Sequence, residues 1–443
     1  MKRTLRFWPL LATIYFCVSG GPFGLEPVMQ VGAGLAVLLL LVTPLIWSVP
    51  AALLTAEMGS AMPEEGGYYV WVKRAVGQPW AFLCGWWTWL YSWVDTAIYP
   101  TLFAAYTGRF LELLGYSTAI ETNPWVKWSV GLLVIIPLTW LNVRGTKVVG
   151  DGSVSFFAIL LAPFVVLVLL GMSKVLANPA ATVHPFAAPG KATGSVLGVG
   201  LFAVMWNYLG WDSISTVSGE VYEPRRTLPR ALAVGVPIVA ITYVLPALIG
   251  LAVLKRPDQW QEDAWVEVAS SIGGTWLAIA VTAAGIVSSA GLFSATLLAS
   301  SRVPFVLAEE KFLPSVLSKL HPKWGSPWVA ILVSAVFYTG FSYEKFNDLT
   351  VVDVVLYSSA LLLELAALVV LRKKEPGMDR PFRIPGGVPA LIFVVAAPVI
   401  LIAFACYSRF QEKGQVAIWS SLVALISGPT VWIIGQASKK LLG

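Results

Sequence analysis

Seven carboxylates lie inside long apolar segments of this chain, where an ionised side chain is costly. At the centre of a bilayer each costs at least about 2.5 kcal/mol on insertion scales. The sequence places no Lys or Arg at comparable depth, so protons, water or a cationic ligand must neutralise these acids. The seven are Glu26, Glu57, Asp95, Asp212, Glu220, Asp353 and Glu364.

The first apolar segment is interrupted by the stretch Ser19-Gly20-Gly21-Pro22-Phe23-Gly24-Leu25-Glu26. Its three glycines relax the backbone, and Pro22 cannot donate to the carbonyl one turn back, so a helix must break here. In lipid such a break survives only against protein or a water-filled cavity. Glu26, directly after the break, predicts a site for a cation. A Pro-kinked helix that ends at Glu26 is the alternative interpretation.

A second apolar segment repeats this pattern in the other half of the chain. Asn207-Tyr208-Leu209-Gly210-Trp211-Asp212 places polar residues and a glycine inside an apolar span, and Glu220 follows. The two interrupted segments each open a set of five predicted helices. Paired interruptions in corresponding positions indicate an inverted-repeat transporter with its site near the membrane midplane. The pair therefore favours a substrate site over two coincident kinks.

Asp95 lies in an aromatic segment, with Tyr91 four residues before it and Tyr99 four residues after it. This spacing puts the three side chains on one helix face. Aromatic faces and carboxylates together suit an alkylammonium group, although helix packing is the alternative role for the two tyrosines. The predicted substrate-binding residues are Gly20, Gly21, Gly24, Glu26, Tyr91, Asp95, Tyr99, Asn207, Tyr208, Trp211 and Asp212.

Further polar residues in the apolar segments are assigned to coupling and gating. Glu57 and Glu220 lie near helix ends and are interpreted as gate or helix-end residues. Ser288 and Ser289 could coordinate a small cation, but helix packing is the favoured role. Asp353 is interpreted as the start of the tenth helix, and Glu364 has no assigned partner. No metal-ligand spacing and no nucleophile–base pair occurs, so we expect no metal, no cofactor and no enzyme activity.

The composition is that of a polytopic membrane protein. The 443 residues are 57% hydrophobic and 12% charged, with a mean hydropathy of +0.76. Soluble domains carry about twice that charge density. A spanning helix needs about 20 mostly apolar residues. Twelve segments qualify, at about 7–31, 34–60, 80–108, 125–142, 153–175, 195–221, 229–254, 275–300, 327–341, 350–371, 388–408 and 415–437.

No long linker separates these segments, so we expect one all-α membrane domain over residues 1–443. Its first repeat covers about 7–175 and its second about 195–371, and two additional helices cover about 388–437. Residues 63–74 predict a short amphipathic helix on the membrane surface.

The basic residues predict the orientation. Most of the 30 Lys and Arg residues fall in loops on one side, which we assign to the cytoplasm. Both termini are then cytoplasmic, and the protein lies in the cell membrane. The basic loops are 2–6, 73–74, 144–147, 225–230, 302–323, 372–383 and 439–440.

Four stretches resemble the amino acid–polyamine–organocation superfamily, and within it the polyamine uptake transporters of plants and protozoa. They are residues 18–26, 63–68, 94–100 and 207–220. The resemblance implies a five-plus-five inverted repeat with two extra helices, discontinuous helices 1 and 6, and proton-coupled alternating access. Many amino-acid members bind the substrate carboxylate with free amides of the helix 1 break. Here Pro22 removes one donor and Glu26 adds a negative charge, which favours an amine.

These observations predict a proton-coupled transporter of polyamines or related organic cations. The alternative is a permease for neutral or cationic amino acids, and a third possibility is a non-transporting sensor or partner subunit. The expected partners are the small-molecule substrate, protons and the lipid bilayer, and no nucleic acid. Some proton-coupled relatives place a Lys in helix 5, but residues 153–170 contain none.

Overall fold

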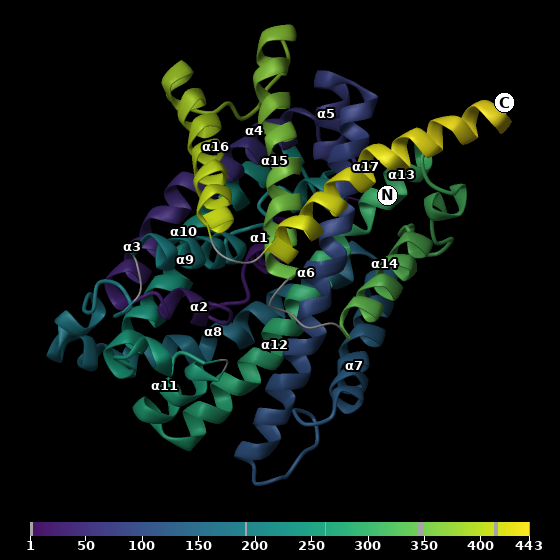
Figure 1. The fold of residues 1–443 in the computed structure, drawn as a ribbon. Coiled ribbons are helices and arrows are strands. Elements are labelled where there is room, and N and C mark those ends of the chain that lie inside the picture. The colour runs from purple at the N-terminus through teal and green to yellow at the C-terminus, as the bar shows by residue number, and fades with distance from the viewer. Residues whose placement is uncertain (1–2, 191–192, 262, 344–348, 412–414, 443) are drawn as a thin grey trace.

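The computed structural model describes residues 3–190, 193–261, 263–343, 349–411 and 415–442. The described residues form helices and connecting loops without a β-strand (Figure 1). Lys2, which contributes to the predicted orientation, lies outside them.

The helices, in chain order, are α1 (Phe7–Val18), α2 (Glu26–Met29), α3 (Ala33–Thr43), η1 (Pro44–Ser48), α4 (Val49–Ala61), α5 (Tyr68–Val76), α6 (Gln78–Leu113), α7 (Pro124–Val143), α8 (Thr146–Ala177), η2 (Pro179–Thr182), α9 (Thr193–Asn207), η3 (Ser213–Glu220), α10 (Pro224–Val253), η4 (Pro257–Gln259), α11 (Ala264–Gly273), α12 (Thr275–Ser300), α13 (Arg302–Glu309), η5 (Ser315–Ser318), α14 (Trp328–Phe341), α15 (Leu349–Lys374), α16 (Gly387–Gln411) and α17 (Gln415–Leu442).

Each of the twelve predicted segments falls on one or more of these helices. Seven helical stretches of the described residues are long and apolar enough to cross a membrane, and three shorter apolar helices accompany them, namely α1, the described part of α9, and α14. The 36-residue α6 is longer still, but its many Trp and Tyr residues lower its mean hydropathy. The prediction of an all-α, multi-pass membrane protein is therefore confirmed.

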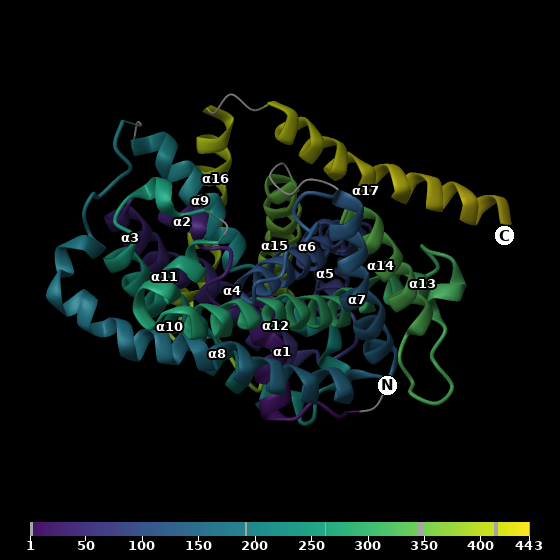
Figure 2. The same ribbon diagram turned by 90° about the horizontal axis from the view of Figure 1, so that it is seen from below.

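Helix α12 runs through the middle of the bundle and packs against α1, α6 and α8 (Figures 1 and 2). Small residues permit these close contacts. A Cβ at Gly285 would lie 2.7 Å from the Tyr106 ring of α6, and one at Gly291 would lie 2.5 Å from Phe16 of α1. The centre of the bundle thus depends on glycines that face aromatic rings.

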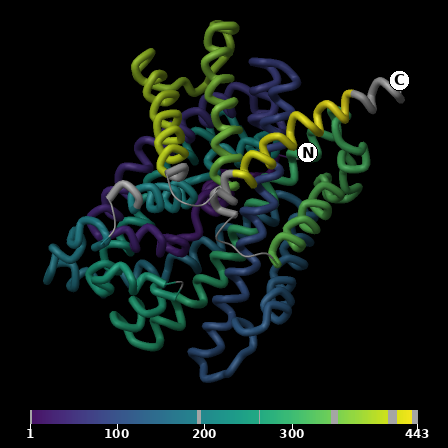
Figure 3. The backbone as a smooth tube through the Cα atoms, viewed as in Figure 1, coloured from purple at the N-terminus to yellow at the C-terminus, as the bar shows by residue number. Residues whose placement is uncertain are grey.

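Two groups of elements mark opposite ends of the bundle. Both views place α5, α13 and the first described residues on one side and α11 on the other. As predicted, α5 is a short amphipathic helix, with Trp71 and Val72 buried and Lys73 paired to Glu310 at 2.5 Å. Helices α16 and α17 lie at the outer edge of the bundle (Figures 2 and 3).

The predicted orientation can be tested with single cysteines in a Cys406→Ala background, since Cys17 and Cys84 are buried and Cys406 is exposed. We expect a cysteine at Arg225 to react with an impermeant thiol reagent only from the cytoplasmic side. A cysteine at Asp258 should react only from outside, because Asp258 lies in η4, within the connection between α10 and α11.

Both chosen positions are exposed, whereas the neighbouring Trp260 is fully buried and would be a poor reporter. Reaction of both cysteines from the same side would contradict the orientation.

Candidate functional site

The first interruption separates α1 from α2. Gly21 and Gly24 between them have φ angles of +72° and +89°, in the left-handed region that favours glycine. The carbonyl of Gly20 accepts a 2.6 Å hydrogen bond from the Ser288 hydroxyl of α12. The backbone break is therefore held against α12, as a non-helical segment in a membrane requires.

Side chains of the same stretch satisfy two amides of this break. The Gly24 amide donates to Glu26 Oε2 at 2.8 Å, and the Gly21 amide donates to Ser19 Oγ at 3.1 Å. Glu26 is buried at the start of α2. The Glu26 carboxylate thus occupies an amide that would otherwise be open to an anionic ligand.

The second interruption follows α9, which ends at Asn207. Gly210 has a φ of +89°, and a Cβ there would lie 2.2 Å from the Cys17 carbonyl oxygen of α1. The Asn207 amide Nδ2 donates to the Gly24 carbonyl at 2.8 Å. The two interruptions are therefore in direct contact, and glycine at position 210 makes their close approach possible.

A cavity lies at this junction, between the two interruptions and helices α6 and α12. It contains about 820 Å³ of empty space, counting its opening. Aromatic rings form much of its wall, including Phe23, Tyr68, Tyr106 and Trp206. Seven residues predicted to bind substrate or to couple also line it, namely Gly20, Tyr91, Asp95, Tyr99, Asn207, Ser288 and Ser289.

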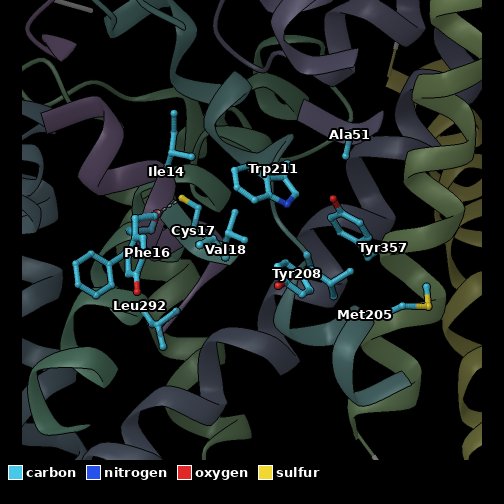
Figure 4. Close-up of a cluster of buried hydrophobic side chains, with 14 of the residues drawn as sticks. Ile14, Phe16, Cys17, Val18, Ala51, Met205, Tyr208, Trp211, Leu292 and Tyr357 are labelled. Atoms are coloured by element: carbon cyan, nitrogen blue, oxygen red, sulfur yellow. Dashed lines mark hydrogen bonds between the residues drawn. The ribbon is translucent and has the colours of Figure 1, made fainter. Parts of the chain in front are cut away.

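The other predicted substrate-binding residues lie outside this wall. Tyr208 and Trp211 are fully buried in an apolar cluster, with the Tyr208 hydroxyl 3.3 Å from the Leu40 carbonyl oxygen (Figure 4). They do not line the space that a substrate would fill in this conformation. The remaining residues outside the wall are Gly21, Gly24, Glu26 and Asp212.

Asp95 is the one carboxylate among the described residues that line the cavity. Both of its oxygens lie 2.9 Å from the Tyr99 hydroxyl. The Trp206 indole lies near the carboxyl groups of Asp95 and Asp353. The described wall contains no Lys or Arg. The cavity therefore offers a carboxylate and aromatic faces to a positively charged ligand.

Helix α15 contributes two acids for which the sequence predicts no binding site. Asp353 is fully buried and lies near Asp95, so its interpretation as merely the start of a helix misses this proximity. Glu364 is fully buried and faces Asp212, which accepts a 2.5 Å hydrogen bond from the Tyr357 hydroxyl. Residues 353, 357 and 364 share one helix face, and this spacing is the signal that could have revealed them.

The prediction that no basic residue reaches the buried acids is wrong for Glu57 and Glu220. Glu57 pairs with Arg372, whose Nε lies 2.8 Å from Oε1, and with Arg380. Glu220 pairs with the fully buried Arg302 at 2.8 Å. Arginines near helix ends extend their long side chains inward to reach these carboxylates. A gating role for Glu57 and Glu220 stays a prediction.

The two serines of α12 use their hydroxyls within the protein. Ser288 donates to the break, as described above, and Ser289 donates to the Gly285 carbonyl of its own helix at 2.9 Å. These bonds favour the packing role, and cation coordination stays a prediction.

Glu65, in the connection between α4 and α5, is largely buried near the Glu220–Arg302 pair. Burial, and secondly the Glu220 carboxylate, raise the pKa of Glu65 to about 8. Its neighbour Glu64 is exposed. The connection therefore contains one acid that changes charge close to neutral pH.

Comparison with known proteins gives consistent matches over almost the whole chain. The amino acid permease family model matches residues 5–434. The polyamine transporter RMV1 of Arabidopsis thaliana is 34% identical, over 98% of this chain and 85% of its own length. The polyamine transporter PUT1 of Oryza sativa is 35% identical, over 97% of this chain and 78% of its own.

A solved structure shares the fold. The crystal structure of MhsT in complex with L-phenylalanine aligns with a TM-score of 0.66 at 15% sequence identity. The alignment covers 92% of this chain and 99% of that one.

We expect Arg302→Met to destabilise the protein by about 3–5 kcal/mol, because it leaves the Glu220 carboxylate buried without a partner. Thermal unfolding in detergent measures the effect. Adding Glu220→Gln to Arg302→Met should restore most of the loss. The control is Arg225→Met, which removes an exposed pair with Asp379 and should cost less than about 1 kcal/mol. Equal losses for the two single variants would contradict this account.

We expect the stability of the protein to fall as the pH rises from about 4.5 through about 8, in part because of Glu65. The folded state holds this proton more tightly than the unfolded chain does, so deprotonation favours unfolding. Glu65→Gln should reduce the difference in melting temperature between about pH 6 and about pH 9. Glu64→Gln is the matched control and should leave it unchanged. An unaltered difference in Glu65→Gln would show that Glu65 does not titrate there.

Proposed function

The chain belongs to the amino acid permease family, and we propose that it carries polyamines or related organic cations across the membrane in transport that is coupled to protons. It is a secondary transporter, as its relatives are, and not an enzyme. Alternating access opens the substrate site first to one side of the membrane and then to the other.

The main support for this proposal is the negative charge that Asp95 gives the cavity wall. Asp95 lines it together with Tyr91, Tyr99 and Trp206, and no described Lys or Arg neutralises that wall. An ammonium group can form a charged hydrogen bond with Asp95 and contact the aromatic faces. The alkyl chain of a polyamine would then pack against the rings.

The first interruption supports a cation over an amino acid. The amide of Gly24 is bonded to Glu26, and that of Gly21 to Ser19, so neither is free for a substrate carboxylate. A carboxylate near Glu26 would also meet a like charge. A permease for neutral or cationic amino acids remains the second candidate, because the family model is that of amino acid permeases and MhsT was solved with L-phenylalanine.

The proposal includes the architecture and its setting. Residues of about 7–175 and about 195–371 form the two repeats of one membrane domain, and those of about 388–437 add two helices. The protein lies in the plasma or inner membrane with both termini in the cytoplasm. The basic loops on the side of α5 and α13 support this orientation.

We expect Asp95→Asn to raise the half-saturation concentration for spermidine about ten- to a hundred-fold in proteoliposomes. A charged hydrogen bond contributes roughly 1.5–3 kcal/mol, and the variant keeps the shape while it removes the charge.

The control is Asp151→Asn, which removes an exposed acid of α8 and should leave uptake unchanged. Counterflow with putrescine, spermidine, arginine and leucine as competitors identifies the substrate. If the wild type takes leucine and ignores polyamines, the amino-acid alternative is correct.

A further inference from the structure

Asp212 and Glu364 form a buried pair of carboxyl groups behind the cavity wall. Asp212 is 1% exposed and Glu364 is 0% exposed, and their side chains face each other. Neither residue lines the cavity. Asp212 comes from the second interruption, directly before η3, and Glu364 from the middle of α15.

The other groups that face this pair are neutral tyrosines and thiols. They are Tyr357 of α15, Tyr91 and Cys84 of α6, Tyr68 of α5 and Cys17 of α1. No Lys or Arg of the described chain forms an ion pair with either acid. Both oxygens of Glu364 lack any hydrogen bond in the described structure. This arrangement differs from that of Glu57 and Glu220, each of which has an arginine.

Two carboxylates in contact in an apolar interior cannot both carry a negative charge at an acceptable cost. One proton between them removes the repulsion and creates a donor. A protonated Glu364 can donate to Asp212, and this bond supplies the partner that the Glu364 oxygens lack. The Tyr357 hydroxyl, 2.5 Å from Asp212, stabilises the remaining negative charge.

The pair is connected to the cavity through aromatic side chains. The rings of Tyr357 and Tyr91 are 5.6 Å apart, edge to face, and the Tyr91 hydroxyl lies 3.2 Å from the Ser213 hydroxyl. Tyr91 and Ser213 both line the cavity, and Ser213 directly follows Asp212. A movement of the second interruption would therefore alter the cavity wall and the carboxyl pair together.

We propose that Asp212 and Glu364 share one proton and form the proton-carrying site of this transporter. This assignment depends on the proton coupling proposed above, and it names the residues that would carry the proton. A proton that enters forms an O–H bond on one carboxyl and neutralises it. On the opposite side of the membrane, where water reaches the pair, that bond breaks and the proton passes to water. The substrate binds elsewhere, with an ammonium group at Asp95 in the cavity wall.

The test compares driven and exchange transport in proteoliposomes that contain the full chain and labelled spermidine. With Glu364→Gln we expect an imposed pH gradient to give no accumulation above equilibrium, while counterflow continues, because the cavity is intact. The matched control Glu112→Gln removes an exposed acid of α6 and should accumulate substrate as the wild type does. Normal gradient-driven accumulation by Glu364→Gln would overturn the proposal.

A wild type that does not respond to the gradient would instead contradict the proton coupling itself, so the two failures are distinct. Infrared difference spectra supply a readout that does not depend on transport. The carbonyl stretch of a protonated carboxylic acid should be present in the wild type, and Glu364→Gln should remove the part of this band that the Asp212–Glu364 pair contributes. An unchanged band would place the proton elsewhere.

Tyr357→Phe tests the same site with an almost unchanged shape. Loss of the hydrogen bond from Tyr357 destabilises the charged form of Asp212, so the pair should keep its proton to higher pH. We expect the half-maximal pH of transport to rise by roughly one unit. No shift, or a shift to lower pH, would overturn the assignment.

Discussion

The central constraint on this structure is the cost of a carboxylate in an apolar interior. Buried carboxylates are accommodated in two ways in this chain. Glu57 and Glu220 are paired with arginines that extend inward from helix ends. Asp95 and Asp212 instead face tyrosines and the two acids of α15. In the first arrangement arginines neutralise the carboxylates, whereas the acids of the second must be neutralised by a proton or by a bound cation.

The backbone places the second group of acids at the point where both interrupted helices meet. Asn207 bonds to Gly24, and Gly210 lies against the Cys17 carbonyl, so the two interruptions form one unit. Interrupted helices are tolerated in a membrane because their free backbone groups find partners in protein or in a cavity. Here the partners are Ser288, Glu26 and Ser19, and the cavity lies beside them. The first interruption is thus stabilised by a serine of α12 and by polar side chains of the interruption itself.

The sequence allowed much of this to be predicted, because glycine, proline and acidic residues are conspicuous in apolar segments. Both interruptions, the span positions and the approach of Asp95 to Tyr99 follow from local spacing. The contacts between distant helices could not be predicted in the same way. Arg302 was assigned to a loop, although the fold buries it against Glu220. The partners of Asp95 and Asp212 on α15 depend on how that helix packs, which no local pattern encodes.

Substrate recognition in this transporter depends, we propose, on a cation that binds Asp95 in the cavity. The most direct test is a cryo-electron microscopy structure of the purified transporter with spermidine. We expect density for an elongated ligand between the two interruptions, with an ammonium nitrogen within hydrogen-bonding distance of the Asp95 carboxylate. If the cavity stays empty with spermidine, and leucine instead binds with its carboxylate on the backbone amides of the first interruption, the claim is contradicted.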